Sequence, residues 1–389
     1  MAEEIPVNPE ILRWARATAG LSTEAVAAKL SRKKITAETV AAWEKGAASP
    51  TYPQLERLAY EIYKRPLALF FFPEAPQEET PNQSFRSLPD EEIRHLPPRL
   101  LYLLRQARAM QLNVAELYDE VNPATQQVVR DLSFTPHHAV SEMATVVREY
   151  LGVELATQCQ WGTPEEAFKE WRAVLETHGV FIFKEAIKDA AFSGFCLYDA
   201  HFPVIYVNNS KPATRQIFTL FHELAHLVFG TGGIDTRLED YLEFLHGDAR
   251  RIEVACNRFA GEFLVPHHDF NRRIEGATLD DETVGNLASR YGVSREVILR
   301  KLLDRGLVGQ EEYERKAAAW AAEVVGRTKG EGNYYRTKGA YLGERYLEVA
   351  FSRYYQERIS REQLAGYLGV KTRNIPGMEA LLFHKGAAA

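Results

Sequence analysis

Cysteine is scarce in this sequence. The 389 residues include three cysteines, Cys159, Cys196 and Cys256, which lie far apart and form no C-x-x-C pair. An odd number of widely spaced cysteines argues against a disulfide framework and indicates a reducing compartment.

The sequence also lacks long apolar runs and a surplus of positive charge. The longest apolar run, PLALFFFP at residues 66–73, is too short to cross a bilayer. The opening decapeptide MAEEIPVNPE is acidic and has no apolar core of the kind that signal peptides carry. The net charge of −6 is not typical of a chain that binds nucleic acid along its whole length. We therefore expect a cytoplasmic protein without a membrane partner.

What is present is the composition of a folded globular protein. Hydrophobic residues make up 46% of the chain and charged residues 26%, which is enough for a full-sized core. At roughly 150 residues per domain, the length predicts two or three domains. Helical spacing, capping residues and a proline-rich stretch divide the chain into four predicted segments: 1–72, a compact bundle of four or five helices; 73–135, a linker and connecting helices; 136–310, helices around a small sheet; and 311–389, a helical region without an assigned role. In the last segment, tyrosines near helical spacing favour core packing or a homodimer contact over a ligand site.

Short segments rich in β-branched and aromatic residues predict the sheet. GVFIFK, FSGFCLYD and FPVIYVN follow one another with brief connections, so we expect an antiparallel meander. The predicted fold class is α+β, mostly helical, with a small and mainly antiparallel sheet. A helix follows the last strand, with Pro212 near its start and Gly230 at its end.

That helix contains the pattern H-E-x-x-H at His222, Glu223 and His226. It is apolar almost all round between residues 217 and 229, and its four polar side chains, these three with Thr219, fall on one stripe. Histidines at i and i+4 lie one above the other, close enough for both imidazoles to reach one ion. Buried histidines that merely satisfy backbone groups are the alternative, but this stripe would then need three separate partners. We therefore predict a Zn²⁺ site on the stripe.

A zinc ion that acts in catalysis needs a third protein ligand and an open position. Glu253, on the next predicted helix, is the best candidate. Asn257 follows one turn later, where a hydrogen bond from it could hold a ligand in place.

These two helices resemble a known family. HELAHLVFG followed by EVACNRFAGEFLVP is similar to the ImmA/IrrE family of zinc metallopeptidases, in which H-E-x-x-H precedes a helix of the form E-x-x-A-N-x-F-A-x-x-L-L-x-P. The resemblance covers about residues 140–310. It implies a zincin-like domain in which His222, His226 and Glu253 bind zinc and Glu223 is the general base. Cys256, where the family commonly has alanine, is interpreted as a packing residue.

The resemblance implies peptide hydrolysis. Zinc would lower the pKa of a water molecule and polarise the scissile carbonyl, while Glu223 would take the proton of the water and pass it to the leaving amine. The preceding strands are expected to offer an edge on which an extended peptide pairs. A further side chain should stabilise the oxyanion, and six candidates stay open: His201, Tyr206, Tyr241, His246, His267 and His268.

Residues 8–72 resemble a second family, the Xre/Cro-like helix-turn-helix domains. The similarity lies in S-x-x-x-x-A-x-x-L from Ser22, in W-E-x-G from Trp43 and in a proline before the fourth helix. It implies DNA binding, with TAETVAAWE as the helix that enters the major groove. The expected contacts are Thr23, Arg32, Lys33, Lys34, Thr36, Ala37, Glu38, Thr39 and Lys45. Because the expected reading helix has no Arg, Asn or Gln for bidentate base contacts, recognition of a protein is the alternative.

Three functions are compatible with the sequence. The first is a DNA-binding transcriptional regulator fused to a zinc endopeptidase that cleaves a regulatory protein, such as a repressor, in stress response, mobile-element or toxin–antitoxin control. Cleavage would occur in trans or within the linker between Pro73 and Pro98. The second is a non-catalytic DNA-binding regulator or antitoxin with a structural zinc or a sensor site. The third is a protease whose helical domain recognises only a partner protein. Glu223 favours an enzyme, because a purely structural site needs no general base.

Overall fold

The computed structural model describes residues 4–30, 35–76, 97–187, 192–236, 247–325 and 333–386. The chain divides into two compact units, one of residues 1–84 with 88–109 and one of residues 85–87 with 110–389. The domain boundaries predicted after residues 72, 135 and 310 stay predictions.

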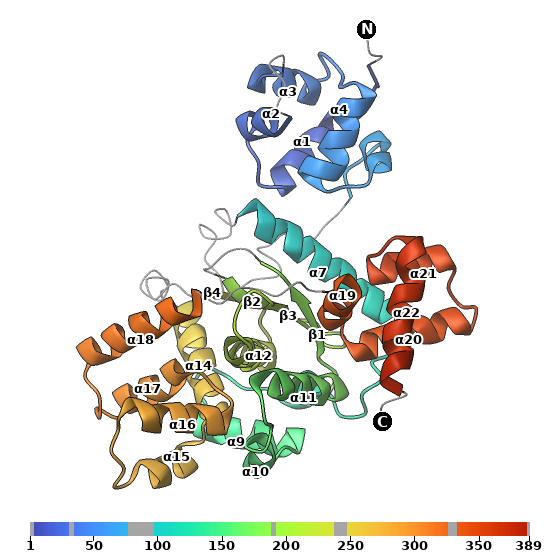
Figure 1. Cartoon of the computed structure of the whole chain (residues 1–389). Helices are drawn as coiled ribbons and strands as arrows, with labels where there is room; N and C mark the ends of the chain where they lie inside the picture. Colours follow the sequence, from blue (N-terminus) through green and yellow to red (C-terminus); the bar gives the residue numbers. More distant parts are fainter. Residues whose placement is uncertain are drawn as a thin grey trace. The chain divides into compact units, whose positions relative to one another are not determined.

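The first unit is a bundle of short helices (Figure 1). Its elements are α1 (Pro9–Thr18), α2 (Thr23–Leu30), α3 (Ala37–Glu44), α4 (Tyr52–Glu56), η1 (Arg57–Tyr63), η2 (Leu67–Phe71) and the part of α7 (Pro98–Leu117) up to Ala109. Apolar residues of α1, α2, α3, α4, η1 and η2 share one core. Thr36 caps α3, because its hydroxyl accepts from the Thr39 amide while the Thr39 hydroxyl accepts from the Thr36 amide. The compact bundle predicted from helical spacing is confirmed.

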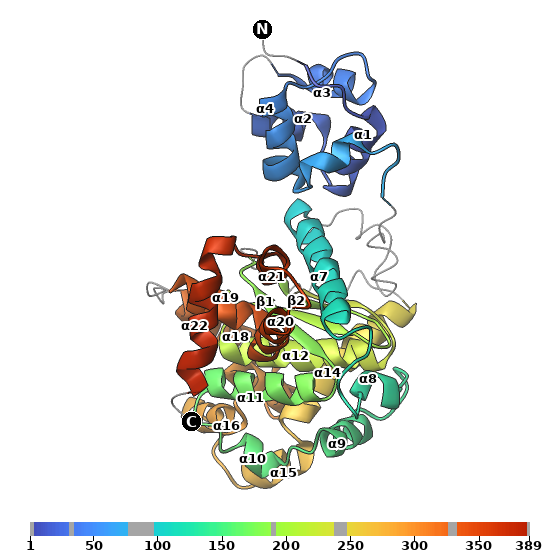
Figure 2. The ribbon, with the colours of Figure 1, turned by 90° about the vertical axis from the view of Figure 1, so that its right-hand side faces the viewer.

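The second unit packs many helices around one small sheet (Figures 1 and 2). The elements between α7 and α12 are α8 (Val128–Asp131), α9 (Val140–Leu151), α10 (Leu155–Gln158), α11 (Pro164–Thr177), β1 (Phe181–Glu185), β2 (Phe192–Leu197) and β3 (Val204–Asn208). The remaining elements, in chain order, are α12 (Ala213–Val228), β4 (Gly233–Thr236), α14 (Gly247–Leu264), α15 (His267–Ile274), α16 (Asp281–Tyr291), α17 (Arg295–Asp304), α18 (Gln310–Val325), α19 (Tyr334–Leu342), α20 (Glu344–Tyr355), α21 (Arg361–Leu368), η3 (Thr372–Asn374) and α22 (Ile375–Gly386). The molecule is thus α+β and mostly helical, as predicted. No described helix combines the length and the apolar character that a bilayer crossing requires.

The four described strands form a mixed sheet in the order β1-β3-β2-β4. β2 pairs antiparallel with β3 and with β4, whereas β1 pairs parallel with β3, with Phe181 opposite Val204. Two of these three pairings are antiparallel, but the predicted meander order is wrong, because β3 lies between β1 and β2. A brief connection limits where the next strand can begin, yet it does not decide which neighbour that strand pairs with.

α12 is the central helix of the unit. Pro212 precedes its first turn, and Gly230 adopts a φ of 71° just beyond its end, a conformation that favours glycine. Twelve of its sixteen residues are buried, since the sheet, α11 and α14 all pack against it. Its polar stripe is therefore held in the interior of the unit, where each polar group needs a partner.

Candidate metal centre

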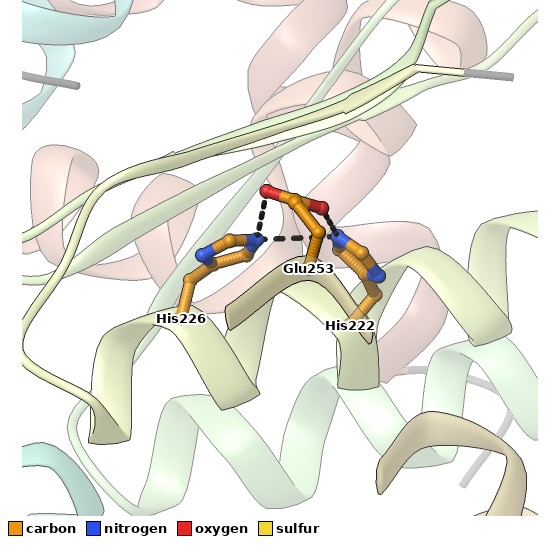
Figure 3. A group of neighbouring side chains, drawn as sticks. All are labelled: His222, His226 and Glu253. Atoms are coloured by element: carbon orange, nitrogen blue, oxygen red, sulfur yellow. Dashed lines mark hydrogen bonds and ion pairs between the residues drawn. The ribbon is translucent and has the colours of Figure 1, made fainter. Parts of the chain in front are cut away.

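Two helices bring together the three side chains predicted as zinc ligands (Figure 3). His222 and His226 extend from successive turns of α12, and Glu253 extends toward them from α14. The two imidazole Nε2 atoms lie 3.2 Å apart. The Glu253 carboxylate lies 3.4 Å from Nε2 of His222 and 3.2 Å from Nε2 of His226. All three residues are at most 4% exposed.

Hydrogen bonds on the far side of each ring determine which nitrogen faces the centre. Nδ1 of His222 lies 3.2 Å from Oδ1 of Asn257, an acceptor, so Nδ1 carries the proton. Nδ1 of His226 lies 3.4 Å from Oγ1 of Thr231, whose own hydroxyl proton is donated to the His226 carbonyl at 3.0 Å. In both neutral imidazoles the lone pair therefore lies on Nε2 and points into the cluster.

The arrangement fits a bound cation. Ligand atoms of His222, His226 and Glu253 lie within 4.8 Å of one another, which makes them a group able to hold a metal ion. Two nitrogen lone pairs and a carboxylate that converge in a buried space repel one another unless a positive charge lies among them. Burial acts to raise the pKa of Glu253, but positive charge at His226 and His222 outweighs it and holds that pKa well below its usual range. When both rings are neutral, a bound cation has to supply that positive charge. The site therefore favours an ionised carboxylate facing a positive charge.

Two glycines let the sheet approach α12 closely. A Cβ atom at Gly233, on β4, would lie 2.3 Å from Cδ2 of His226 and 2.6 Å from its Nε2. A Cβ atom at Gly194, on β2, would lie 2.5 Å from Cγ2 of Thr219. Both distances are far below van der Waals contact, so any other residue would displace the helix or the ring.

Glu223 is fully buried beside the metal ligands, on the same stripe of α12. Its carboxylate neighbours Cys196 of β2, whose Sγ also accepts from the amide of Gly233 at 3.3 Å. Burial, together with the nearby Glu223 carboxylate, raises the pKa of Cys196 well above its ordinary value, so this thiol stays protonated. Cys256 is also buried and is not part of the metal-binding group among the described residues.

The centre opens into a large cleft. Helices α9, α12, α14, α17 and α18 line a hollow of about 2220 Å³, and His222, Glu253 and Asn257 form part of its wall. Small-molecule sites are typically roughly 300–1,000 Å³. The cleft is therefore large enough to take a stretch of polypeptide.

The candidate oxyanion residues are scattered. Tyr206 is buried on β3, where its ring stacks on Phe195 with centroids 5.2 Å apart. His267 lines the cleft, but Glu262 lies 2.7 Å from its Nδ1. His201 is exposed near β3, and the ring of His268 lies against that of His267, tilted by 40°, with centroids 3.8 Å apart. Tyr241 and His246 lie outside the described residues. Among the described residues, no hydrogen bond or ion pair joins His201, His267 or His268 to His222, His226 or Glu253.

The predicted DNA contacts lie in the first unit or outside the described residues. Arg32, Lys33 and Lys34 belong to the undescribed segment 31–34. Thr36, Glu38 and Lys45 are exposed, while Thr23, Ala37 and Thr39 are half-buried. The hydroxyls of Thr36 and Thr39 are occupied in capping α3, and that of Thr23 donates to Glu24. These three hydroxyls therefore already have partners within the first unit, and the DNA contacts stay a prediction.

Sequence reasoning missed Thr231 and Gly233. Both lie in a short segment after the helix, where no hydrophobic period marks a position. The available signal was local: Gly230 ends α12 in the left-handed conformation and turns the chain back along it, which returns the next residues to the last turn of the helix.

Comparisons with known proteins agree with this geometry in part. Residues 175–303 match the model of peptidase family M78, described as the IrrE N-terminal-like domain. A solved Mycobacterium tuberculosis transcriptional regulator is 20% identical, with a TM-score of 0.28, over 42% of this chain and 46% of that one. The chain thus covers less than half the length of that structure. No curated protein matches. The matched domain, which contains all three candidate ligands, is of a metallopeptidase type.

Proposed function

We propose that the second unit is a zinc-dependent endopeptidase. The convergence of two buried imidazole Nε2 atoms and one buried carboxylate supports this assignment most directly, because His222 and Glu253 also form part of the wall of a large cleft. Three N and O donors with room for a further group are the donor set of catalytic zinc sites. The match to peptidase family M78 over residues 175–303 supports the same conclusion.

Each residue of the stripe has a role in this proposal. His222, His226 and Glu253 would hold zinc, which would supply Lewis-acid polarisation of the scissile carbonyl and activation of a water molecule. Glu223 would act as the general base that accepts a proton from the attacking water and passes it to the leaving amine. Asn257 and Thr231 fix the two imidazoles through their Nδ1 atoms.

The substrate backbone would pair with the sheet beside the metal centre. β4 is an edge strand among the described strands, and its Gly233 lies against the ring of His226. An extended peptide added to this edge would satisfy its own amides and carbonyls and pass beside the ligands.

We propose in addition that the first unit binds DNA and makes the protein a regulator. Its bundle of short helices around one core supports this, as does the lysine at the end of α3, Lys45, which is exposed. Together the two proposals describe a regulator that cleaves a regulatory protein, in trans or within its own linker. Most of that linker, residues 77–96, lies outside the described residues.

A Glu223→Gln variant separates the enzyme from a non-catalytic regulator with a structural or sensor metal. The amide keeps the shape of the side chain but cannot accept the proton, so we expect full zinc content with a loss of peptide cleavage of roughly 10²–10⁴-fold. The measurements are metal analysis of both purified proteins and proteomic comparison of cells that carry either one. Fragments absent from the variant would identify the substrate, and the intact mass of the protein itself would reveal self-cleavage. If every biological effect survives in the variant, the regulator alternative replaces the enzyme.

A further inference from the structure

The wall of the cleft carries more positive than negative side chains, although the whole chain has a net charge of −6. Eight Arg and Lys residues line it against six Asp and Glu residues, among which Glu253 belongs to the metal-binding group. A surplus of one sign of charge on the wall of a cleft attracts ligands of the opposite sign. The imbalance therefore bears on the kind of polypeptide that this cleft attracts.

Most of the acidic side chains in the cleft are already engaged within the protein. Glu262 pairs with Lys301 at 2.8 Å, and Glu323 pairs with Arg295 at 2.5 Å. Asp304 lies 3.2 Å from Arg300, and Glu314 accepts from Gln310 at 2.7 Å. Glu262, Glu323 and Asp304 therefore have their negative charge matched by a cationic partner, whereas Glu314 keeps its charge beside a neutral amide.

Arg250 and Arg258 differ from the paired cleft residues, because both are exposed and neither has an acidic partner among the described residues. They lie on α14, the helix that also provides Glu253 and Asn257. Eight residues of helix separate them, a rise of about 12 Å, so one extended stretch of roughly four residues can reach both.

A third arginine lies at the α12 side of the cleft. Nε of Arg215 donates to Oγ of Ser193 at 3.0 Å, and its guanidinium carbon lies 5.3 Å from the ring centre of Phe218. These contacts hold the side chain in place one helix away from Arg250 and Arg258. Charge thus lies on two helices that also carry the metal ligands.

We infer that the cleft selects a polypeptide segment with acidic side chains near the bond to be cut, and that Arg250 and Arg258 recognise them. This inference rests on the proposed peptidase function, since it names the substrate class of the same site. Guanidinium groups match carboxylates through paired, charge-assisted hydrogen bonds, which an amide or an alcohol does not equal.

The test uses full-length Glu223→Gln protein loaded with zinc, so that bound peptides survive. A pool of random decapeptides is passed over the immobilised protein, and the retained peptides are sequenced. We expect Asp and Glu to be enriched roughly threefold or more over Asn and Gln, since two exposed charge pairs make a moderate contribution. Adding Arg250→Glu and Arg258→Glu should abolish the enrichment or reverse it toward Lys and Arg.

A matched control carries Arg336→Glu and Arg361→Glu, two exposed arginines on α19 and α21 that do not line the cleft. It has the same change in net charge and should keep the enrichment. Absence of enrichment with the parent protein, an enrichment unchanged by the α14 pair, or an equal loss in the control overturns the inference. If acidic peptides are retained through Arg250 and Arg258 but wild-type protein with zinc cleaves none of them, the recognition stands and the peptidase proposal fails.

Discussion

At the residue scale, the geometry of the candidate metal centre depends on atoms outside the ligand set. The Nδ1 contacts of His222 and His226 place both lone pairs on Nε2, so the ligand set is prepared before any ion binds. One contact comes from Asn257, which the spacing along α14 predicts. The other comes from Thr231, which no periodic pattern marks.

A Thr231→Val variant tests whether Thr231 fixes the tautomer of His226. Valine keeps the shape of threonine but offers no acceptor for Nδ1–H of His226, so either imidazole nitrogen can then carry the proton. We expect a zinc affinity lower by roughly 10–100-fold, measured by competition with a chelator of known affinity. Thr145→Val is the control, because the Thr145 hydroxyl bonds only to the Ser141 carbonyl on the exposed side of α9. Equal affinities for both variants and the wild type would show that Thr231 does not position the ring.

Gly233 also helps to position the ring of His226, because it leaves space that a side chain would fill. Because a Cβ there would lie 2.3 Å from Cδ2 of His226, we expect Gly233→Ala to displace the imidazole and weaken zinc binding by at least tenfold. Isothermal titration with zinc measures the change. Gly285→Ala is the control, since α16 has open space at that position and alanine should stabilise the helix by about 0.5–1 kcal/mol. Unchanged zinc affinity in Gly233→Ala would mean that β4 shifts to make room for the methyl group and that zinc binding does not require glycine at this position.

At the scale of elements, the sequence predicts helices better than it predicts strand order. The ends of α12 follow from Pro212 and Gly230, and its buried polar stripe follows from a period of 3.6 residues. β4 has only four residues and no apolar alternation, so no sequence pattern marks it as a strand. The parallel pairing of β1 with β3 depends on tertiary contacts, which a local sequence pattern does not specify.

The junction of α15 and α16 offers a stability test at this scale. Asp269 of α15 accepts from Arg273 at 2.7 Å and from the hydroxyl of Tyr291, on α16, at 2.8 Å. Partial burial acts to raise the pKa of Asp269, but hydrogen bonds from Arg273, Tyr291 and Arg272 outweigh it and hold the pKa at about 2. A folded-state pKa below the usual 3.8 means that ionised Asp269 stabilises the fold above about pH 4.

That stabilisation should disappear as the pH falls from about 4 to about 2. We expect Asp269→Asn to lower the free energy of unfolding at pH 7 and to show a smaller further loss than the wild type across this acid range. Urea unfolding at a series of pH values measures both. Asp304→Asn, at a side chain 53% exposed, should behave as the wild type does. Parallel acid profiles for Asp269→Asn and the wild type would exclude Asp269 as the group responsible.

At the scale of the whole molecule, the sequence separates a helical N-terminal segment from the metal-binding part, and the structure contains two compact units. It could not show the cleft, because that surface gathers side chains from α9, α12, α14, α17 and α18, which are far apart in the chain. Arg250 and Arg258 read in sequence as an ordinary solvated helix face. The role proposed for them depends on the other helices that complete the cleft around them.

DNA binding by the first unit is the property of the whole molecule that most needs a test. If Lys45 contacts a phosphate, Lys45→Ala should weaken binding to a random-sequence duplex and reduce the slope of log affinity against log salt by about one. Fluorescence anisotropy of the labelled duplex at several salt concentrations measures the slope. Lys371→Ala, an exposed lysine of the second unit, is the control and should leave the slope unchanged. Glu223→Gln should also bind as the wild type does, because the two roles are assigned to separate units. Full-length protein without salt-dependent affinity for the duplex would leave the first unit to recognise a protein, and the capped, Arg-free start of α3 would then be the natural surface to examine for that partner.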